Sequence, residues 1–212
     1  PGDGILIQSP VYPPFFSSAL NHQRRLLVNS LINSEGAYSI DWQDFESKAA
    51  QASMFILCNP HNPIGRAFTH AELSRMAEIC RKHNVIIFSD EIHADIVYAP
   101  FHHIPIASLA EDITITGISP AKSFNLAGLA TAVLISKNKA MLTKVEELSM
   151  NLHTFMGNSF GIVAFTAAYG ASEAWLDELL SYLQANRDYL IGQFAEHFPK
   201  IIVSPIEATF LA

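Results

Sequence analysis

Short apolar runs alternate along this chain with stretches of helical periodicity, and this alternation limits the possible folds more than any other feature. The runs that predict strands cover residues 4–8, 25–31, 54–57, 85–88, 113–118 and 129–135. The stretches that predict helices cover about 15–23, 41–50, 69–83, 137–151, 158–170 and 173–197. Short apolar runs bounded by turn formers are typical of buried strands. The spacing predicts the α/β class: a three-layer, doubly wound, mainly parallel sheet that binds ligands at the carboxyl ends of its strands.

Two of the predicted helices begin at residues that commonly cap helices. Asp41 can accept a hydrogen bond from the first turn of the helix that follows it. Thr69 is followed three residues later by Glu72, which is the pattern of a capping box. These positions fix where helices 41–50 and 69–83 start.

The last predicted helix is long and carries an amphipathic stripe that includes Trp175, Leu179 and Leu183. A helix of this length can bridge two lobes. We therefore assign residues 1–186 to a large domain, and residues 187–212 to the end of the bridging helix and the start of a smaller C-terminal domain. Both ends of the chain lie in strand-like runs, so we expect both domains to be truncated pieces of a longer protein.

The composition is that of a well-packed α/β enzyme, with 50% hydrophobic and 16% charged residues. A net charge of −7 without a basic cluster argues against a nucleic-acid or anionic-membrane surface. No apolar run approaches the roughly 20 residues that span a bilayer, and no secretory signal opens the chain. Two cysteines, Cys58 and Cys80, make no disulfide framework, so we expect a cytoplasmic protein.

A lysine, Lys122, stands in a short polar stretch between the apolar runs 113–118 and 129–135, which both predict buried strands. Burying a charged amine costs free energy unless the amine has a partner or has lost its charge. An uncharged amine can form a Schiff base with an aldehyde. We therefore predict that Lys122 binds an aldehyde cofactor covalently.

Three further residues fit such a cofactor, although each also has a purely structural interpretation. Asp90 follows four apolar residues and can pair with a protonated pyridine nitrogen, or it can simply cap a helix. Asn62, between two prolines, can donate to a phenolate oxygen or serve as a turn residue. Tyr12, in a proline-stiffened loop, can stack on a planar ring or pack as an ordinary aromatic.

The spacing of these residues carries more information than any one of them. Asn62, Asp90 and Lys122 are separated by 28 and 32 residues, about one βα unit each. Successive strand ends would therefore deliver them to one crevice.

At this point the motifs resemble those of a known family, the fold-type I, pyridoxal-phosphate-dependent aminotransferases of class I/II. The three matching motifs are Asn59-Pro-His-Asn-Pro-Ile-Gly65, Ser89-Asp90-Glu91 and Ser119-x-x-Lys122. The resemblance implies that pyridoxal 5′-phosphate is the cofactor of the 1–186 domain and that Lys122 is the Schiff-base lysine. It further implies that Asp90 pairs with the pyridinium, Asn62 donates to O3′, Tyr12 stacks on the ring and Ser119 binds the phosphate.

Two departures narrow the resemblance to a subgroup. His93 stands where aminotransferases usually have a tyrosine near the cofactor, and Ala130 stands where they usually have a phosphate-binding arginine. The stretches Asp90–Tyr98 and Lys122–Gly128 instead resemble the MalY/PatB-type cystathionine β-lyases, as do Tyr169 and the segment from Trp175, for which we expect packing roles.

The subgroup implies a carbon–sulfur β-lyase that cleaves L-cystathionine or related cysteine S-conjugates to a thiol (homocysteine), pyruvate and ammonia. An aminotransferase remains the alternative. So does an inactive fragment that acts as a dimerisation or interaction module, because the family's phosphate-binding glycine loop and carboxylate-binding arginine lie outside this sequence. The family implies a homodimer, and the aromatic-rich segments 12–16 and 153–160 are the interface that we expect.

Two rival interpretations of the polar residues are weaker. Ser119-x-x-Lys122 is also a nucleophile motif of penicillin-recognising acylases, but the Ser-Asp-Asn and Lys-Thr-Gly motifs that must follow it do not occur. His93, His102 and His103 with Asp95 suggest a metal site, but their spacing is no standard zinc pattern. We expect no metal ion.

Overall fold

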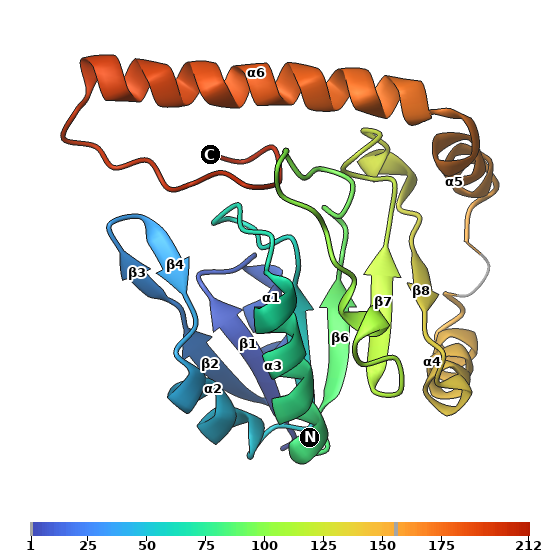
Figure 1. Ribbon diagram of the computed structural model, residues 1–212. Helices are drawn as coiled ribbons and strands as arrows, with labels where there is room; N and C mark the ends of the chain where they lie inside the picture. Colours follow the sequence, from blue (N-terminus) through green and yellow to red (C-terminus); the bar gives the residue numbers. More distant parts are fainter. Residues whose placement is uncertain (1, 155–156) are drawn as a thin grey trace.

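A computed structural model of the chain describes residues 2–154 and 157–212. Its centre is a six-stranded sheet in the order β2-β1-β5-β6-β7-β8 (Figure 1). The strands are β1 (Gly4–Ser9), β2 (Arg25–Ser30), β5 (Met54–Cys58), β6 (Ile86–Asp90), β7 (Thr114–Ile118) and β8 (Val133–Ile135). All neighbours pair in parallel except β8, which is antiparallel to β7. The carboxyl ends of five strands therefore lie along one edge of the sheet.

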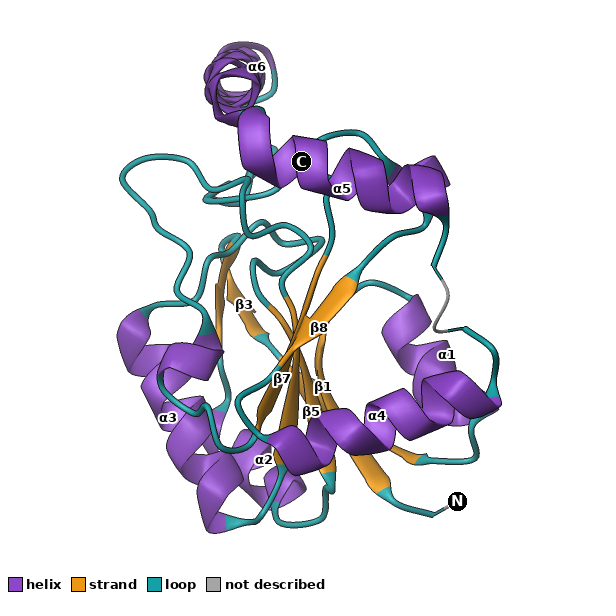
Figure 2. Ribbon diagram, turned by 90° about the vertical axis from the view of Figure 1, so that its right-hand side faces the viewer, coloured by secondary structure: helices purple, strands orange, loops and turns teal. Residues whose placement is uncertain are grey.

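Helices cover both faces of this sheet (Figure 2). On one face lie α2 (Trp42–Ala49) and α3 (His70–Lys82), and on the other lie α1 (Pro14–Asn21) and α4 (Lys139–Asn151). Neighbouring residues of β1 divide between the two faces, because side chains alternate along a strand. Leu6 belongs to the larger core with α2 and α3, and Ile7 belongs to the smaller core with Phe15 of α1. The three-layer, mainly parallel fold predicted from the sequence is thus confirmed.

The last two helices lie at the carboxyl edge of the sheet (Figure 1). They are α5 (Ser159–Ala171) and the single long helix α6 (Glu173–His197), and two short 3-10 turns, Ile106–Ser108 and Ala127–Leu129, precede them in the chain. In the described residues no helix is both long and apolar enough to cross a membrane.

The chain after α6 runs back beneath this helix, and we call residues 203–212 the return segment (Figure 1). The N–H groups of Glu207 and Ala208 both donate to the carbonyl of Gly65 at 2.9 Å. Thr209 donates its N–H to Ile96 and accepts the hydroxyl proton of Tyr98 at its carbonyl. The return segment is therefore bonded to the loops that follow β5 and β6.

The predicted helices and strands agree with the structure within a few residues, with two exceptions. The first is a hairpin of β3 (Ile32–Ser34) and β4 (Ala37–Ser39), which was not predicted. Its turn has positive φ at both Glu35 (51°) and Gly36 (85°). This geometry favours two-residue hairpins. The strands contain few apolar residues, so their sequence carries no clear alternation.

The second exception is the strand predicted at 129–135. It begins only at Val133, because Ala130 takes a left-handed conformation (φ 45°) that interrupts the chain after the turn at Ala127–Leu129. All three residues of β8 are exposed, so the prediction of a buried strand here is wrong. Its apolar residues Val133, Leu134 and Ile135 are 36%, 41% and 53% exposed.

Arg66 ties three parts of the fold together near the carboxyl edge. Its guanidinium makes two hydrogen bonds to the carboxylate of Glu72, at 2.9 and 3.0 Å, and one to the carbonyl of Tyr38 in β4. Burial alone would raise the pKa of Glu72, but the hydrogen bonds from Arg66 and from the Thr69 cap lower it. Glu207 of the return segment lies 3.9 Å from the same guanidinium.

We expect Arg66→Met to lower the free energy of unfolding by about 2–3 kcal/mol, because the variant leaves two half-buried carboxylates without their cation. Urea unfolding followed by circular dichroism measures this. Arg24→Met, which removes a more exposed pair with Asp3, is the matched control and should cost under about 1 kcal/mol. Equal losses in the two variants would contradict the role assigned to Arg66.

Candidate active site

The loops after β5, β6 and β7 begin side by side. Cys58 is paired with Asp90 across β5 and β6, and Asp90 with Gly117 across β6 and β7. The residues that end or follow these strands include Asn62, Asp90 and Lys122. The structure therefore brings them to one edge of the sheet, as their spacing predicts.

The loop from Asn59 to Gly65 is held in place by its own side chains. The amide of Asn59 donates to the carbonyl of Ile104 and accepts from the N–H of Phe68, so this residue fastens the loop at both ends. Gly65 closes the loop at φ 68°, and an added Cβ would lie 3.3 Å from the carbonyl oxygen of Ala208. Glycine adopts such a φ without steric cost, and here it also gives the return segment room to dock.

Asn62 and Tyr12 lie next to each other at this edge. The N–H of Tyr12 donates to the carbonyl of Asn62 at 3.2 Å, and the buried His61 bonds through Nε2 to the carbonyl of Pro10 at 2.8 Å. The ring of Tyr12 meets Phe15 edge-on, and the residue is 46% exposed, so part of Tyr12 remains accessible to a ligand.

Asp90 lies at the end of β6 with its carboxylate largely enclosed. Among the described residues the only hydrogen-bond donor to that carboxylate is the N–H of Ile92, at 3.2 Å. Burial raises the pKa of Asp90 and the negative charge of Glu91 raises it further, while the hydrogen bond from Ile92 and the charge of Lys122 lower it. A cation placed against this carboxylate would be strongly favoured.

His93 lies beside the same site and is buried. Its Nδ1 has no hydrogen-bond partner among the described residues, and its ring meets Phe210 of the return segment at 5.5 Å. Burial and, to a lesser degree, the charge of Lys122 lower the pKa of His93 to about 4. The imidazole is therefore neutral near pH 7, and its Nδ1 can accept or donate a hydrogen bond.

Ser119 and Lys122 belong to the loop after β7. The hydroxyl of Ser119 donates to the carbonyl of Thr131 at 2.6 Å and accepts the N–H of Ala121, so its single proton is already used. Lys122 lines a cavity of about 390 Å³. The apolar walls of this cavity come from Ile96, from α6 and from the return segment, through Trp175, Leu179, Leu183 and Phe210.

Two residues of the metal site considered from the sequence, His103 and Asp95, make hydrogen bonds to other side chains. His103 bonds to the buried Glu91 at 2.8 Å, and Asp95 accepts the hydroxyl proton of Ser123 at 2.7 Å. No group of three or more potential metal-ligating side chains occurs in the described part of the chain. The contacts of Asp95 and His61 had no signal in the sequence, because both depend on loops that lie far apart in the chain.

Buried neutral histidines make the apoprotein sensitive to acid. Burial lowers the pKa of His61, like that of His93, to about 4. The pKa of a histidine in an unfolded chain is about 6.5. The unfolded chain therefore binds more protons between these values, and stability is lost as the pH falls from about 6.5 to about 4. We expect each histidine to cost about 2 kcal/mol between pH 7 and pH 5, measured by urea unfolding.

A pair of variants isolates this effect. His61→Gln should remove about half of the loss at pH 5, whereas His197→Gln, at an exposed position, should leave the loss unchanged. Asp90 acts in the opposite direction, because its raised pKa favours the protonated folded state as the pH falls. An apoprotein whose stability does not change between pH 7 and pH 5 would contradict the neutral, buried state of these rings.

Comparison with known proteins extends this description. The family model described as "Aminotransferase class I and II" matches residues 1–212. Cystathionine beta-lyase PatB of Bacillus subtilis is 37% identical over all of this chain and 56% of its own length. A PLP-bound putative aminotransferase from Clostridium difficile (39% identity, TM-score 0.95) and PLP-containing cystalysin from Treponema denticola (30% identity, TM-score 0.96) each match 99% of this chain and 55% of their own. The chain thus spans about half the length of the relatives it matches.

Proposed function

The chain belongs to the aminotransferase class I and II family, and from this membership we propose that it forms the cofactor-binding part of a pyridoxal-5′-phosphate-dependent carbon–sulfur β-lyase. The proposed reaction takes L-cystathionine or a related cysteine S-conjugate with water, and gives a thiol such as homocysteine, pyruvate and ammonia. The observation that carries the proposal is that Asp90, at the end of β6, and Lys122, in the loop after the neighbouring strand β7, lie at the same carboxyl edge of the sheet. The name of the B. subtilis relative supports the same reaction.

The residues at this edge fit the cofactor chemically. The enclosed carboxylate of Asp90 accepts only one described hydrogen bond, so it can accept another from the N–H of a pyridinium ring. The Nδ1 of His93, which has no partner among the described residues, offers a second polar contact, and the partly exposed Tyr12 offers a stacking surface. Asn62 supplies an amide donor for the cofactor's phenolic oxygen.

Ser119 fits its proposed role only after a rotation. Its hydroxyl must leave the carbonyl of Thr131 before it can donate to a phosphate oxygen. The N–H of Ala121, which donates to the same hydroxyl, lies in the same loop and can follow.

When bound, pyridoxal phosphate supplies an electron sink that stabilises negative charge on the α carbon of the substrate. Lys122 would hold the cofactor through its amine, and its Nζ, when free, would remove the proton from the α carbon of the substrate as a general base. Asp90 would keep the proton on the pyridine nitrogen and so preserve the electron sink.

An aminotransferase is the second candidate, because the C. difficile neighbour bears that description and the first two roles are common to both reactions. A third possibility is that the 212-residue chain alone is an inactive interaction module. The full-length protein, purified with pyridoxal phosphate, should release pyruvate from L-cystathionine. Amino transfer to an added oxo acid without pyruvate release would favour the aminotransferase. If the protein catalyses neither reaction, both enzyme proposals are wrong.

We further propose that this protein works as a homodimer in the cytoplasm, with a domain boundary near residue 187 in α6. Both cysteines are free and buried, in keeping with a reducing compartment. The described residues of α6 are all at least partly exposed, in keeping with a helix that bridges lobes. Exposed apolar side chains gather on β8, α4 and α5, including Ile135, Leu148, Phe160 and Val163.

The proposed interface differs in part from the expectation from sequence. Phe15, in the expected segment 12–16, is buried in the smaller core, whereas Phe160 is 81% exposed. Residues 155 and 156 of the other expected segment lie outside the described residues.

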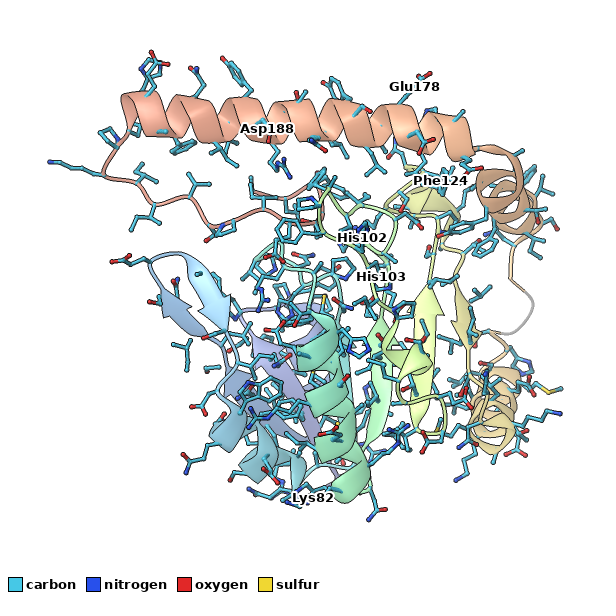
Figure 3. The ribbon with its side chains drawn as sticks, in the orientation of Figure 1. Lys82, His102, His103, Phe124, Glu178 and Asp188 are labelled. Atoms are coloured by element: carbon cyan, nitrogen blue, oxygen red, sulfur yellow. The ribbon has the colours of Figure 1, made fainter. Side chains whose placement is uncertain are left out.

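In sedimentation velocity we expect a dimer at micromolar concentration, because an apolar surface of this kind is rarely left open to water. Phe160→Glu should shift the equilibrium toward the monomer, whereas Glu178→Lys, on the outer face of α6 in Figure 3, should not. A full-length protein that remains monomeric throughout would contradict the interface.

A further inference from the structure

Asp95 connects three segments of the chain around the proposed site. Its Oδ2 accepts the hydroxyl proton of Ser123 at 2.7 Å and that of Tyr169, in α5, at 3.2 Å. Ser123 is completely buried and is the immediate neighbour of Lys122. Asp95 itself lies five residues after Asp90, in the loop that follows β6. One carboxylate oxygen thus connects the loop that follows β6 and Asp90 (the Asp90 loop), the loop after β7 that carries Lys122 (the Lys122 loop) and α5.

The aromatic residue that follows Ser123 is held at the same place. The ring of Phe124 meets Tyr169 edge-on at 5.3 Å and stacks on Trp175 of α6 at 5.7 Å. Figure 3 shows Phe124 beneath the first turns of α6. Burial, together with the charge and the hydrogen bond of Asp95, raises the pKa of Tyr169, so its hydroxyl remains a donor.

These contacts bear on Lys122, which has a long and flexible side chain. Fixing the backbone on one side of a flexible amine narrows the positions that its Nζ can reach. Within the described residues Lys122 makes no hydrogen bond or ion pair of its own, so its direction depends on the loop that carries it. The contact between Ser123 and Asp95 is the nearest hydrogen bond that links this loop to the Asp90 loop.

We propose that Asp95 is a positioning residue that holds Lys122 in reach of the cofactor through its hydrogen bonds to Ser123 and Tyr169. The inference rests on the proposed function and assigns to Tyr169 a hydrogen-bonding role in addition to the packing expected from sequence. Asp95 touches neither cofactor nor substrate in this role. It acts through the loop from Ser119 to Leu126.

The test measures how fast Lys122 of the full-length apoprotein condenses with added pyridoxal phosphate. Visible absorbance gives the rate, and borohydride reduction followed by peptide mass spectrometry assigns the adduct to Lys122. Asp95→Ala should slow this condensation at least about tenfold, because small displacements of a reacting group have large kinetic effects. Ser123→Ala, which removes one hydrogen bond, should slow it about threefold to tenfold.

Two further variants separate positioning from support of the fold. Asp95→Asn keeps an oxygen acceptor at the same place and should recover most of the wild-type rate. The double variant Asp95→Ala/Ser123→Ala should be no slower than Asp95→Ala, because both substitutions remove the same contact. Tyr182→Phe and Asp188→Ala, on exposed parts of α6, are the controls and should react like the wild type.

Each outcome has one meaning. A wild-type protein that forms no adduct at Lys122 would overturn the proposed function. An adduct in the wild type and an equally fast one in folded Ser123→Ala and Asp95→Ala would overturn the positioning role alone, even if their thermal midpoints fell. If Asp95→Ala does not fold, Ser123→Ala is the deciding variant. An unchanged condensation rate in Ser123→Ala overturns the proposal. A slower condensation in Ser123→Ala, with a near wild-type rate in Asp95→Asn, supports it.

Discussion

Replacing Lys122 by alanine in the full-length protein should abolish the borohydride-reducible attachment of pyridoxal phosphate and lower the rate of pyruvate release at least about a thousandfold, within the range that a general base contributes. The reason is chemical, since Lys122 is the one lysine in the three sequence motifs that lie at this edge of the sheet. The fold should survive, because Lys122 makes no described ion pair and its removal relieves a desolvation cost.

Lys82→Ala is the matched control for this substitution. Lys82 ends α3 at the opposite end of the molecule, as Figure 3 shows, and pairs with Glu46 at the surface. The variant should keep full attachment and activity. A reducible adduct that persists at another lysine in Lys122→Ala, with activity, would remove Lys122 from the mechanism.

Asp90→Asn should retain the cofactor but lose at least about a hundredfold in turnover, equivalent to about 2.7 kcal/mol of transition-state stabilisation. A neutral amide cannot hold the proton of a pyridinium nitrogen, although it keeps the shape of the carboxylate. The measurement is kcat for L-cystathionine with cofactor content determined in the same sample. Asp90→Asn also removes a buried carboxylate, so the apoprotein should be no less stable than the wild type.

The control for charge is Asp188→Asn on the exposed side of α6. It changes the net charge by the same amount and should leave kcat unchanged. Near wild-type turnover in Asp90→Asn would exclude the electron-sink role of this residue and would leave His93, with its free Nδ1 among the described residues, as the group to examine next.

Much of the fold could be predicted from the sequence because its determinants are local. The apolar runs of β1, β5, β6 and β7 are short and bounded by turn formers, and Thr69 with Glu72 forms the capping box that their spacing predicts. Asn62, Asp90 and Lys122 could be brought together for the same reason. Each stands at the end of a strand whose neighbours in a parallel sheet follow from regular βα units.

The rest depends on contacts between distant parts of the chain. In the sequence Ser123 cannot be distinguished from any other loop serine. No neighbouring residue indicates its hydrogen bond to Asp95, which lies 28 residues away. The left-handed Ala130 is equally hidden, because alanine has no preference for that conformation. The strand β8 is exposed although its apolar sequence predicts a buried strand. An apolar sequence indicates that a strand is covered, but it does not indicate which part of a protein covers it.

The return segment sets the order in which the chain can complete this edge. Glu207 accepts the N–H of Ala67 across 140 residues of sequence, and Thr209 accepts the hydroxyl of Tyr98 across 111. Contacts of such separation form late in folding, because the intervening chain must first be ordered. During synthesis we expect the βα units to emerge and pair first. The loops at 59–67 and 96–98 can form their hydrogen bonds to Glu207 and Thr209 only after residue 209 has left the ribosome. A nascent chain halted before residue 209 would hold the paired strands β1, β2, β5, β6 and β7 without the hydrogen bonds between these loops and the return segment.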